Sequence, residues 1–132
     1  MPKALDEKRD MIIQEYIKTD YDVRAMVLEN EVIAQLKRPI IDGDFRSNIS
    51  QGNEPQKIEL TELEKEECIK AAKSINSVWV GVDFIPSKDR EKIPPYMIEV
   101  NSSPGTAGII QMNDINIFKL VLESFYNREN WR

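Results

Sequence analysis

The sequence predicts an α+β domain in which a mostly antiparallel sheet of about four to five strands is packed by two main helices. Short apolar runs bounded by turn residues recur at 22–28, 31–38, 78–85 and 96–101, which is typical of strands. Two further segments carry apolar residues at helical spacing. The first two runs are separated by Glu29-Asn30 alone, which predicts a hairpin and therefore antiparallel pairing.

The composition is that of a single globular domain. The chain has 132 residues, of which 41% are hydrophobic and 31% are charged. No apolar run approaches the roughly 18 residues of a membrane helix and no signal peptide is recognisable, so we expect a cytoplasmic protein without membrane contact. The net charge of -5 argues against general nucleic-acid binding. The absence of histidine excludes histidine-based catalysis and histidine-ligated zinc, and the lone Cys68 is expected to be buried and unreactive.

The elements outside the four apolar runs follow from local signals. We expect a further strand at 11–17. Thr61 and Glu64 have the spacing of a capping box, which predicts a helix that ends at about Ser74 or Asn76. We expect this helix to serve packing rather than chemistry.

The last helix is predicted to begin at Asp114, a residue type that is favoured at N-caps. Its apolar residues Phe118, Val121, Leu122 and Phe125 fall at the spacing of one helical face. We therefore expect all four in the core.

The stretch 97–105 reads as a strand that runs into a functional site. Glu99 and Asn101 lie two positions apart and therefore share a face of the strand. Asp83 places another carboxylate inside the strongly apolar run 78–85, where the pattern alone expects an apolar residue. These oxygen donors together favour a site for magnesium or manganese. The alternative for each carboxylate taken singly is a solvated charge on an edge strand.

Two other places carry notable charged residues. Asp22 and Arg24 share one face of the first hairpin strand, where the simplest account is an exposed salt bridge that contributes little. Arg46 lies in the long polar stretch 39–56, and its guanidinium suits a bidentate contact with phosphate. As a spacing signal the loop is weak, because an arginine with neighbouring polar residues is common on surfaces.

In combination, these segments resemble the C-terminal part of an ATP-grasp ligase of the RimK type, a family that includes ribosomal-protein glutamate ligases. The resemblance extends from about Ile12 to Gly108. The motifs that carry it are Gln14-Glu15-Tyr16-Ile17, Asp22-Val23-Arg24, Lys37-Arg38, Gly43-Asp44-Phe45-Arg46-Ser47-Asn48, Gly81-Val82-Asp83 and Glu99-Val100-Asn101-Ser102-Ser103-Pro104-Gly105.

The resemblance implies an ATP-dependent carboxylate–amine ligase. In such enzymes a carboxylate takes the γ-phosphoryl group of ATP, and an amine attacks the acyl phosphate to form an amide, so that an amino acid such as glutamate is joined to a peptide or protein acceptor. The implied roles are adenine contact for Glu15 and Tyr16, ribose contact for Asp22, phosphate or acyl-phosphate contact for Arg24, Lys37, Arg46, Ser47 and Asn48, and binding of two magnesium or manganese ions for Asp83, Glu99 and Asn101.

The resemblance also has departures. Ser50-Gln51-Gly52-Asn53 stands where the family has a basic His-Arg-Gly-Gly segment, so the usual cationic contacts there are missing. No glycine-rich flap precedes the strands, so residues 1–132 are expected to form one C-terminal subdomain that needs an upstream half for turnover. The alternative is a catalytically incomplete ATP-grasp-like binding or interaction module.

Overall fold

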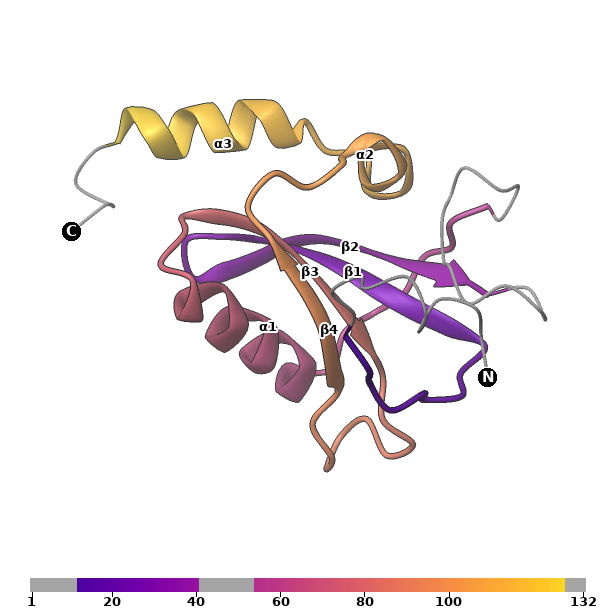
Figure 1. The fold of residues 1–132 in the computed structure, drawn as a ribbon. Helices are drawn as coiled ribbons and strands as arrows, with labels where there is room; N and C mark the ends of the chain where they lie inside the picture. Colours follow the sequence, from indigo (N-terminus) through magenta and orange to yellow (C-terminus); the bar gives the residue numbers. More distant parts are fainter. Residues whose placement is uncertain (1–11, 41–53, 128–132) are drawn as a thin grey trace, which may run out of the picture.

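The structure, a computed structural model, describes residues 12–40 and 54–127 (Figure 1). The elements of these residues are β1 (Tyr21–Leu28), β2 (Glu31–Pro39), α1 (Glu62–Ser74), β3 (Trp79–Ile85), β4 (Tyr96–Asn101), α2 (Ala107–Asn113) and α3 (Ile117–Tyr126). The four described strands form one antiparallel sheet in the order β2-β1-β3-β4. The predicted α+β class and antiparallel sheet are therefore confirmed.

The pairing of β1 with both of its neighbours brings four charged residues to one face of the sheet. In the β1–β2 hairpin, Asp22 lies opposite Arg38. On the other side of β1, Arg24 lies opposite Asp83 of β3. Because side chains alternate between the faces of a strand, all four side chains project from the same face.

The helix α1 covers the opposite face of the sheet (Figure 1). The amide of Glu64 donates to the Thr61 hydroxyl over 3.2 Å, and the Glu64 carboxylate accepts from the Thr61 amide over 3.0 Å. The predicted capping box is thus confirmed, and α1 ends at Ser74. The core between α1 and the sheet consists of Val23, Ala25, Val27, Leu60, Cys68, Ala72, Val80, Val82 and Phe84.

The helices α2 and α3 lie on the face of the sheet that carries the four charged residues, across the sheet from α1 (Figure 1). The sequence indicated no helix at α2. Asp114 has left-handed backbone angles, φ 51° and ψ 40°, and ends α2. The predicted N-cap of the last helix was therefore wrong: Asn116 fulfils that role, because its side chain accepts a hydrogen bond from the Lys119 amide over 3.0 Å.

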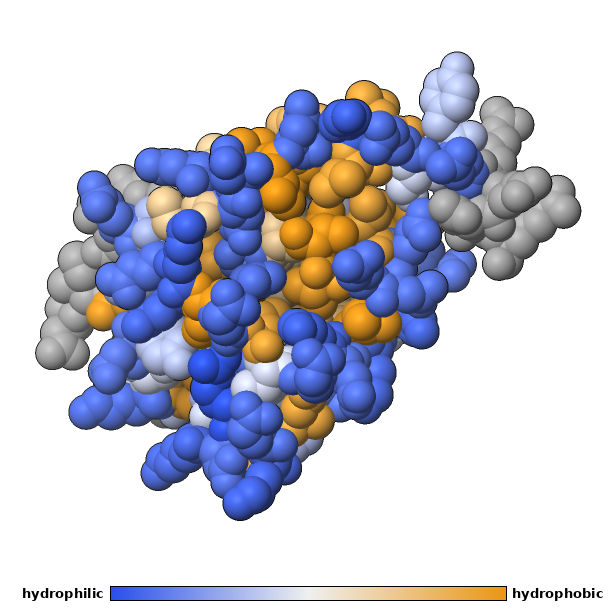
Figure 2. Space-filling view, turned by 180° about the vertical axis from the view of Figure 1, so that it is seen from behind, coloured by the Kyte–Doolittle hydropathy of each residue, from blue (hydrophilic) through white to orange (hydrophobic). Residues whose placement is uncertain are grey.

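The helix α3 is rotated relative to the expectation. Ile117, Val121 and Ser124 are buried, so of the four predicted core residues only Val121 is in the core. The other three are Phe118, Leu122 and Phe125, which are 54%, 67% and 41% exposed. Apolar residues also gather in a patch on the back of the molecule (Figure 2). The apolar stripe of α3 thus faces largely outward in the described part of the chain.

The segment 12–17 was predicted as a strand but is not one. Its apolar side chains are exposed, with Ile12 at 88% and Ile13 at 89%. A strand needs a neighbouring strand for its backbone groups, and in the described sheet the segment 12–17 pairs with neither edge strand, β2 or β4. The apolar pattern of 12–17 therefore lacks the pairing that a strand requires.

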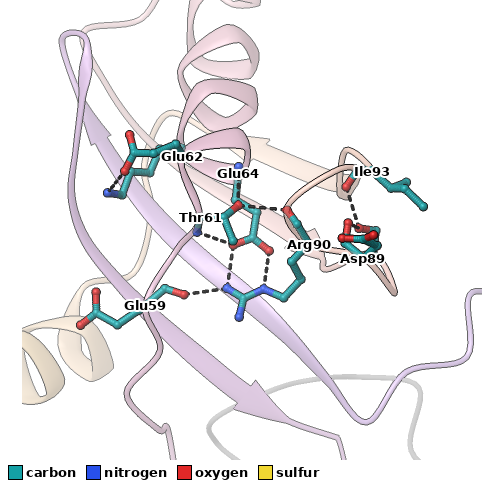
Figure 3. Close-up of polar contacts among 9 residues, drawn as sticks. Glu59, Thr61, Glu62, Glu64, Asp89, Arg90 and Ile93 are labelled. Carbon is teal, nitrogen blue, oxygen red and sulfur yellow. Dashed lines mark hydrogen bonds and ion pairs between the residues drawn. The ribbon is translucent and has the colours of Figure 1, made fainter.

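An ion pair between Arg90 and Glu64 links the connection between β3 and β4 to the start of α1 (Figure 3). Arg90 donates from Nε to Glu64 Oε1 over 2.8 Å and from Nη2 to Oε2 over 2.7 Å. Its Nη2 also donates to the Glu59 carbonyl over 2.6 Å, and the Thr61 hydroxyl donates to the Arg90 carbonyl over 3.1 Å. The hydrogen bond with Glu64 is the main cause that raises the pKa of Arg90. The connection is thereby anchored to the start of the helix.

Candidate functional site

A pocket of about 540 Å³ lies on the sheet face that carries the four charged residues. All four strands and the preceding segment 14–19 contribute to its walls. Its lining consists of Gln14, Glu15, Tyr16, Ile17, Thr19, Asp22, Arg24, Arg38, Ile40, Asp83, Ile85, Tyr96, Met97, Ile98 and Glu99.

The base of the pocket is a network of two arginines and two aspartates. Arg24 donates from Nε to Asp83 Oδ1 and from Nη2 to Asp83 Oδ2, both over 2.7 Å. Arg38 donates from Nε to Asp22 Oδ1 over 2.7 Å and from Nη2 to Asp22 Oδ2 over 2.8 Å. The same Nη2 donates to Asp83 Oδ2 over 2.9 Å. The two bidentate pairs are thus joined through Arg38.

Burial strengthens this network, because charges attract more strongly away from water. The side chains of Asp22, Asp83 and Arg38 are 5%, 7% and 9% exposed, and that of Arg24 is 17% exposed. Desolvation alone would lower the pKa of Arg38, but the hydrogen bond with Asp22 and the charges of both aspartates outweigh it and raise the pKa. Arg38 therefore stays charged at the pocket base.

The three predicted metal ligands lie on the neighbouring strands β3 and β4. Asp83 lies opposite Glu99 across the β3–β4 pair, next to a bulge in the register. Glu99 is exposed and lines the pocket. The Asn101 side-chain oxygen accepts a hydrogen bond from the Ser103 amide over 2.8 Å, and Asn101 lies opposite Gly81. The strand register therefore places all three predicted metal ligands on the same face.

These residues fit a hard divalent cation in donor type. A carboxylate offers about four acceptor positions, and the arginines use three on Asp83, two of them on Oδ2 and one on Oδ1. One position of Oδ1 stays available, and so do Glu99 and the second lone pair of the Asn101 oxygen. Across the part of the chain that the structure describes, no cluster of three or more His, Cys, Asp or Glu side chains suits a metal ion. The predicted set consists of two carboxylates and one amide.

The structure brings together most of the described residues that the sequence proposed. Six of them line the pocket, namely Glu15, Tyr16, Asp22, Arg24, Asp83 and Glu99. Lys37 does not join them, since it lies opposite the buried Val23 on the α1 side of the sheet and places its ammonium 4.3 Å from the ring centre of Tyr21. The proposed phosphate contacts of Arg46, Ser47 and Asn48 lie outside the described residues.

Arg38 is a site residue that was not proposed, although its neighbour Lys37 was. The sequence does contain a signal for it. Arg38 continues the face of β2 that carries the buried Ala34 and Leu36, so a charge stands where the pattern expects an apolar residue. The same kind of interruption identified Asp83 in β3.

Two expectations of absence concern reactivity and membranes. Cys68 is buried, and desolvation raises the pKa of its thiol to about 12, so it stays protonated and unreactive near neutral pH. In residues 12–40 and 54–127, no helix has the length and apolar character that crossing a membrane requires.

The fold is that of an ATP-grasp domain. The family described as RimK-like ATP-grasp domain matches residues 3–125, and the chain belongs to this family. The resemblance seen in the sequence is therefore confirmed.

Curated relatives of this chain are named as glutamate ligases. "Probable alpha-L-glutamate ligase 1" of Shewanella sp. (strain ANA-3) and "Probable alpha-L-glutamate ligase" of Psychromonas ingrahamii are each 36% identical over 118 residues. The aligned region covers 88% of this chain and 38% of each relative. The chain thus spans well under half the length of these relatives.

Solved structures show the same fold. The ATP-grasp ligase PsnB, complexed with a phosphomimetic variant of its minimal precursor, Mg and ADP, gives a TM-score of 0.64 at 21% identity over 86% of this chain and 34% of PsnB. D-alanine–D-alanine ligase from Bacillus anthracis, complexed with ATP, gives a TM-score of 0.51 at 22% identity over 86% of this chain and 39% of the ligase.

Proposed function

We propose that this chain is the ATP- and metal-binding half of an ATP-dependent carboxylate–amine ligase that joins an amino acid such as glutamate to a peptide or protein acceptor. One observation carries the proposal. Glu15, Tyr16, Asp22 and Arg24, which the family resemblance assigns to the nucleotide, line one pocket with Asp83 and Glu99, which it assigns to the cation, and a buried network of arginines and aspartates forms the base of this pocket. The glutamate ligase names of the relatives support the substrate class.

The nucleotide side of the pocket is formed by Glu15, Tyr16 and Asp22. Glu15 and Tyr16 precede β1 in a segment without regular structure, where backbone groups are available for the edge of an adenine base. Asp22 is fixed by Arg38, so its carboxylate is held in place for a ribose hydroxyl. A ligand that already finds its polar partners oriented loses less entropy on binding.

The phosphate and metal side is formed by Arg24, Asp83, Glu99 and Asn101. Bound ATP and its magnesium or manganese ions supply the phosphoryl group and part of the charge neutralisation that activate a carboxylate. Oδ1 of Asp83, the Glu99 carboxylate and the Asn101 oxygen would hold the cation. Arg24 contributes fixed positive charge beside the phosphates, which stabilises charge on transferring oxygens without a side-chain nucleophile. The unreactive Cys68 agrees with such chemistry.

The proposal includes a second half. We expect the upstream ATP-grasp subdomain, with its flap and lysines, to complete the clamp on ATP. Residues 1–132 alone should then bind magnesium–ATP weakly and turn it over negligibly, because closure and several cationic contacts are missing.

The test is reconstitution. ADP release is measured for residues 1–132 alone and after addition or fusion of the upstream half of a glutamate ligase relative, with a panel of amino acids and peptide acceptors. We expect amino-acid-dependent ADP release only in the reconstituted protein. In that protein Arg46→Ala should weaken nucleotide binding without loss of stability, and Arg46→Lys should restore charge but not bidentate contact. Robust turnover by residues 1–132 alone would contradict the half-site proposal.

A second candidate is the binding or interaction module without turnover. The observation that favours it is that both oxygens of Asp83 already accept hydrogen bonds from Arg24 and Arg38. A carboxylate that is neutralised in this way binds a cation less strongly than a free one. A reconstituted pair that binds ADP but releases none from ATP with any amino acid would support this alternative.

A further inference from the structure

Arg38 occupies a place that neither the nucleotide side nor the metal side of the pocket explains. It lies on β2, but its guanidinium extends across β1 to reach Asp83 on β3. On the way it holds Asp22 of β1 through a bidentate contact. It therefore contacts the carboxylate expected to bind ribose and the carboxylate expected to bind the cation.

A single nitrogen joins these two carboxylates. Nη2 of Arg38 carries two N–H groups, and it donates to Asp22 Oδ2 over 2.8 Å and to Asp83 Oδ2 over 2.9 Å. The two oxygens are thus held within the reach of one donor atom. Any movement of the Asp22 carboxylate must either move the guanidinium or break one of these bonds, and the same holds for Asp83.

The negative charges of Asp22 and Asp83 require a positive group between them, and the Arg38 guanidinium is that group. Two carboxylates that approach this closely in a buried site repel each other strongly unless a cation lies between them. Arg24 neutralises Asp83 alone, whereas Arg38 contacts both Asp83 and Asp22. The rigid planar fork of arginine can serve three acceptor oxygens in fixed directions, which the single ammonium of lysine cannot reproduce.

We propose that Arg38 is a positioning residue that couples nucleotide binding to cation binding, by holding Asp22 and Asp83 through one guanidinium. The inference rests on the proposed function, in which Asp22 faces the nucleotide and Asp83 the cation. A nucleotide that orders Asp22 then also orders Asp83 for the cation, and a cation on Asp83 favours the nucleotide-binding position of Asp22. By thermodynamic linkage the effect is reciprocal.

The measured quantity is the ADP dissociation constant of residues 1–132 in EDTA divided by the ADP dissociation constant at saturating magnesium. Both constants are obtained by calorimetry. Formation of magnesium–ADP in solution affects every variant equally, so differences between ratios report the protein. The variants are Arg38→Lys, which keeps the charge but not the fork, and Arg38→Met, which removes both. The matched control is Arg90→Lys, which alters a bidentate pair on the far side of the sheet.

We expect Arg38→Lys and Arg38→Met to lower the ratio at least about fivefold, the lower end of typical coupling between sites. Arg90→Lys should keep the ratio of the unaltered chain even where its urea midpoint falls. Should Arg38→Met fail to fold, Arg38→Lys decides, since it leaves no uncompensated charge. Circular dichroism establishes that each titrated variant is folded.

Three results would overturn the inference. An unchanged ratio in Arg38→Lys would show that only the charge of Arg38 matters, and an equal loss in Arg90→Lys would reveal a general effect of lost stability. An unaltered chain that binds ADP with no dependence on magnesium would refute the coupling but leave nucleotide binding intact. An unaltered chain that binds neither ADP nor magnesium would instead refute the proposed function together with the inference.

Discussion

Each face of the sheet carries a bidentate arginine–carboxylate pair, and we assign the two pairs different roles. On the α1 face, Arg90 holds Glu64 through two hydrogen bonds, and on the pocket face Arg24 holds Asp83 in the same way. Each carboxylate accepts three hydrogen bonds in total, because Thr61 adds one to Glu64 and Arg38 adds one to Asp83. The number of partners therefore does not distinguish a structural pair from a functional one.

What differs is the space beside each pair. The Glu64 side chain is 1% exposed and adjoins the helix cap, so its remaining acceptor position has no room for a ligand. Asp83 lines a pocket of about 540 Å³, and exposed Glu99 lies opposite it. A buried arginine–carboxylate pair is thus a site only where an open cavity and further donors adjoin it. Substitutions at the two pairs should therefore differ in their effects on stability and on ligand binding.

Arg90→Met should cause the largest loss of stability. The substitution leaves the buried Glu64 without its charged partner. Because Arg90 itself is 30% exposed, the cost should lie at the lower end of the range for buried pairs, about 3 kcal/mol of unfolding free energy. Urea unfolding measures the loss. Because Arg90 does not line the pocket, ADP affinity of the folded fraction should stay unchanged. Lys70→Met removes only an exposed ion pair and should leave the urea midpoint almost unchanged.

A reduced ADP affinity in folded Arg90→Met would break the distinction between the two faces. It would mean that a shift of the connection between β3 and β4, which Arg90 holds in place, also shifts the pocket residues at the end of β3 and the start of β4. Comparison with Lys70→Met shows whether any such effect comes from Arg90 itself.

Gly81→Ala should have an intermediate effect, on the pocket face. A Cβ at this position would lie 2.6 Å from the Pro104 Cβ, which is closer than two carbon atoms that are not bonded to each other can approach. Displacing Pro104 and its turn should cost about 1–3 kcal/mol, as other overpacked sites do. Since Gly81 lies opposite Asn101, cation affinity should fall as well. The thermal midpoint and magnesium titration of the same sample measure both.

Gly105→Ala is the matched control for this glycine. The nearest heavy atom to its added Cβ is the Arg24 guanidinium at 4.0 Å, which is ordinary contact distance. We expect no loss of stability. If Gly105→Ala destabilised the chain as much as Gly81→Ala, the close approach to Pro104 would not be the cause.

Much of the fold could be predicted from the sequence because its signals are local. The Glu29-Asn30 hairpin and the Thr61–Glu64 cap depend on neighbouring residues, and both are confirmed. The strand predicted at 11–17 and the last helix depended on tertiary partners instead. The rotation of α3 could not be read from its sequence, since the helix is apolar on more than one face.

The candidate site was predictable in part for the same reason. Strand alternation placed Asp22 and Arg24 on a common face, the interruption of an apolar run identified Asp83, and the family resemblance supplied their expected roles. Their joining into one network depends on the sheet order, in which β1 lies between β2 and β3. Sequence reasoning had no access to that order. It chose Lys37 and missed Arg38, which the register places opposite Asp22, although the apolar face of β2 at Ala34 and Leu36 already marked Arg38 as an interruption.

Glu99→Gln should have the smallest effect on stability and a clear effect on the site. Glu99 is exposed, so its loss should change the unfolding free energy by less than about 0.5 kcal/mol. As a predicted cation ligand it should nonetheless carry a large share of metal affinity, and we expect manganese binding to weaken by at least about tenfold, since altering even residues that only support metal ligands has effects of this size. Manganese titration by electron paramagnetic resonance measures the change, with Glu66→Gln on the exposed face of α1 as the charge-matched control. Equal weakening in both variants would indicate an effect of net charge alone. An unchanged manganese affinity in Glu99→Gln would remove the open donor that distinguishes the Asp83 pair from the Glu64 pair, and would leave both faces of the sheet with purely structural ion pairs.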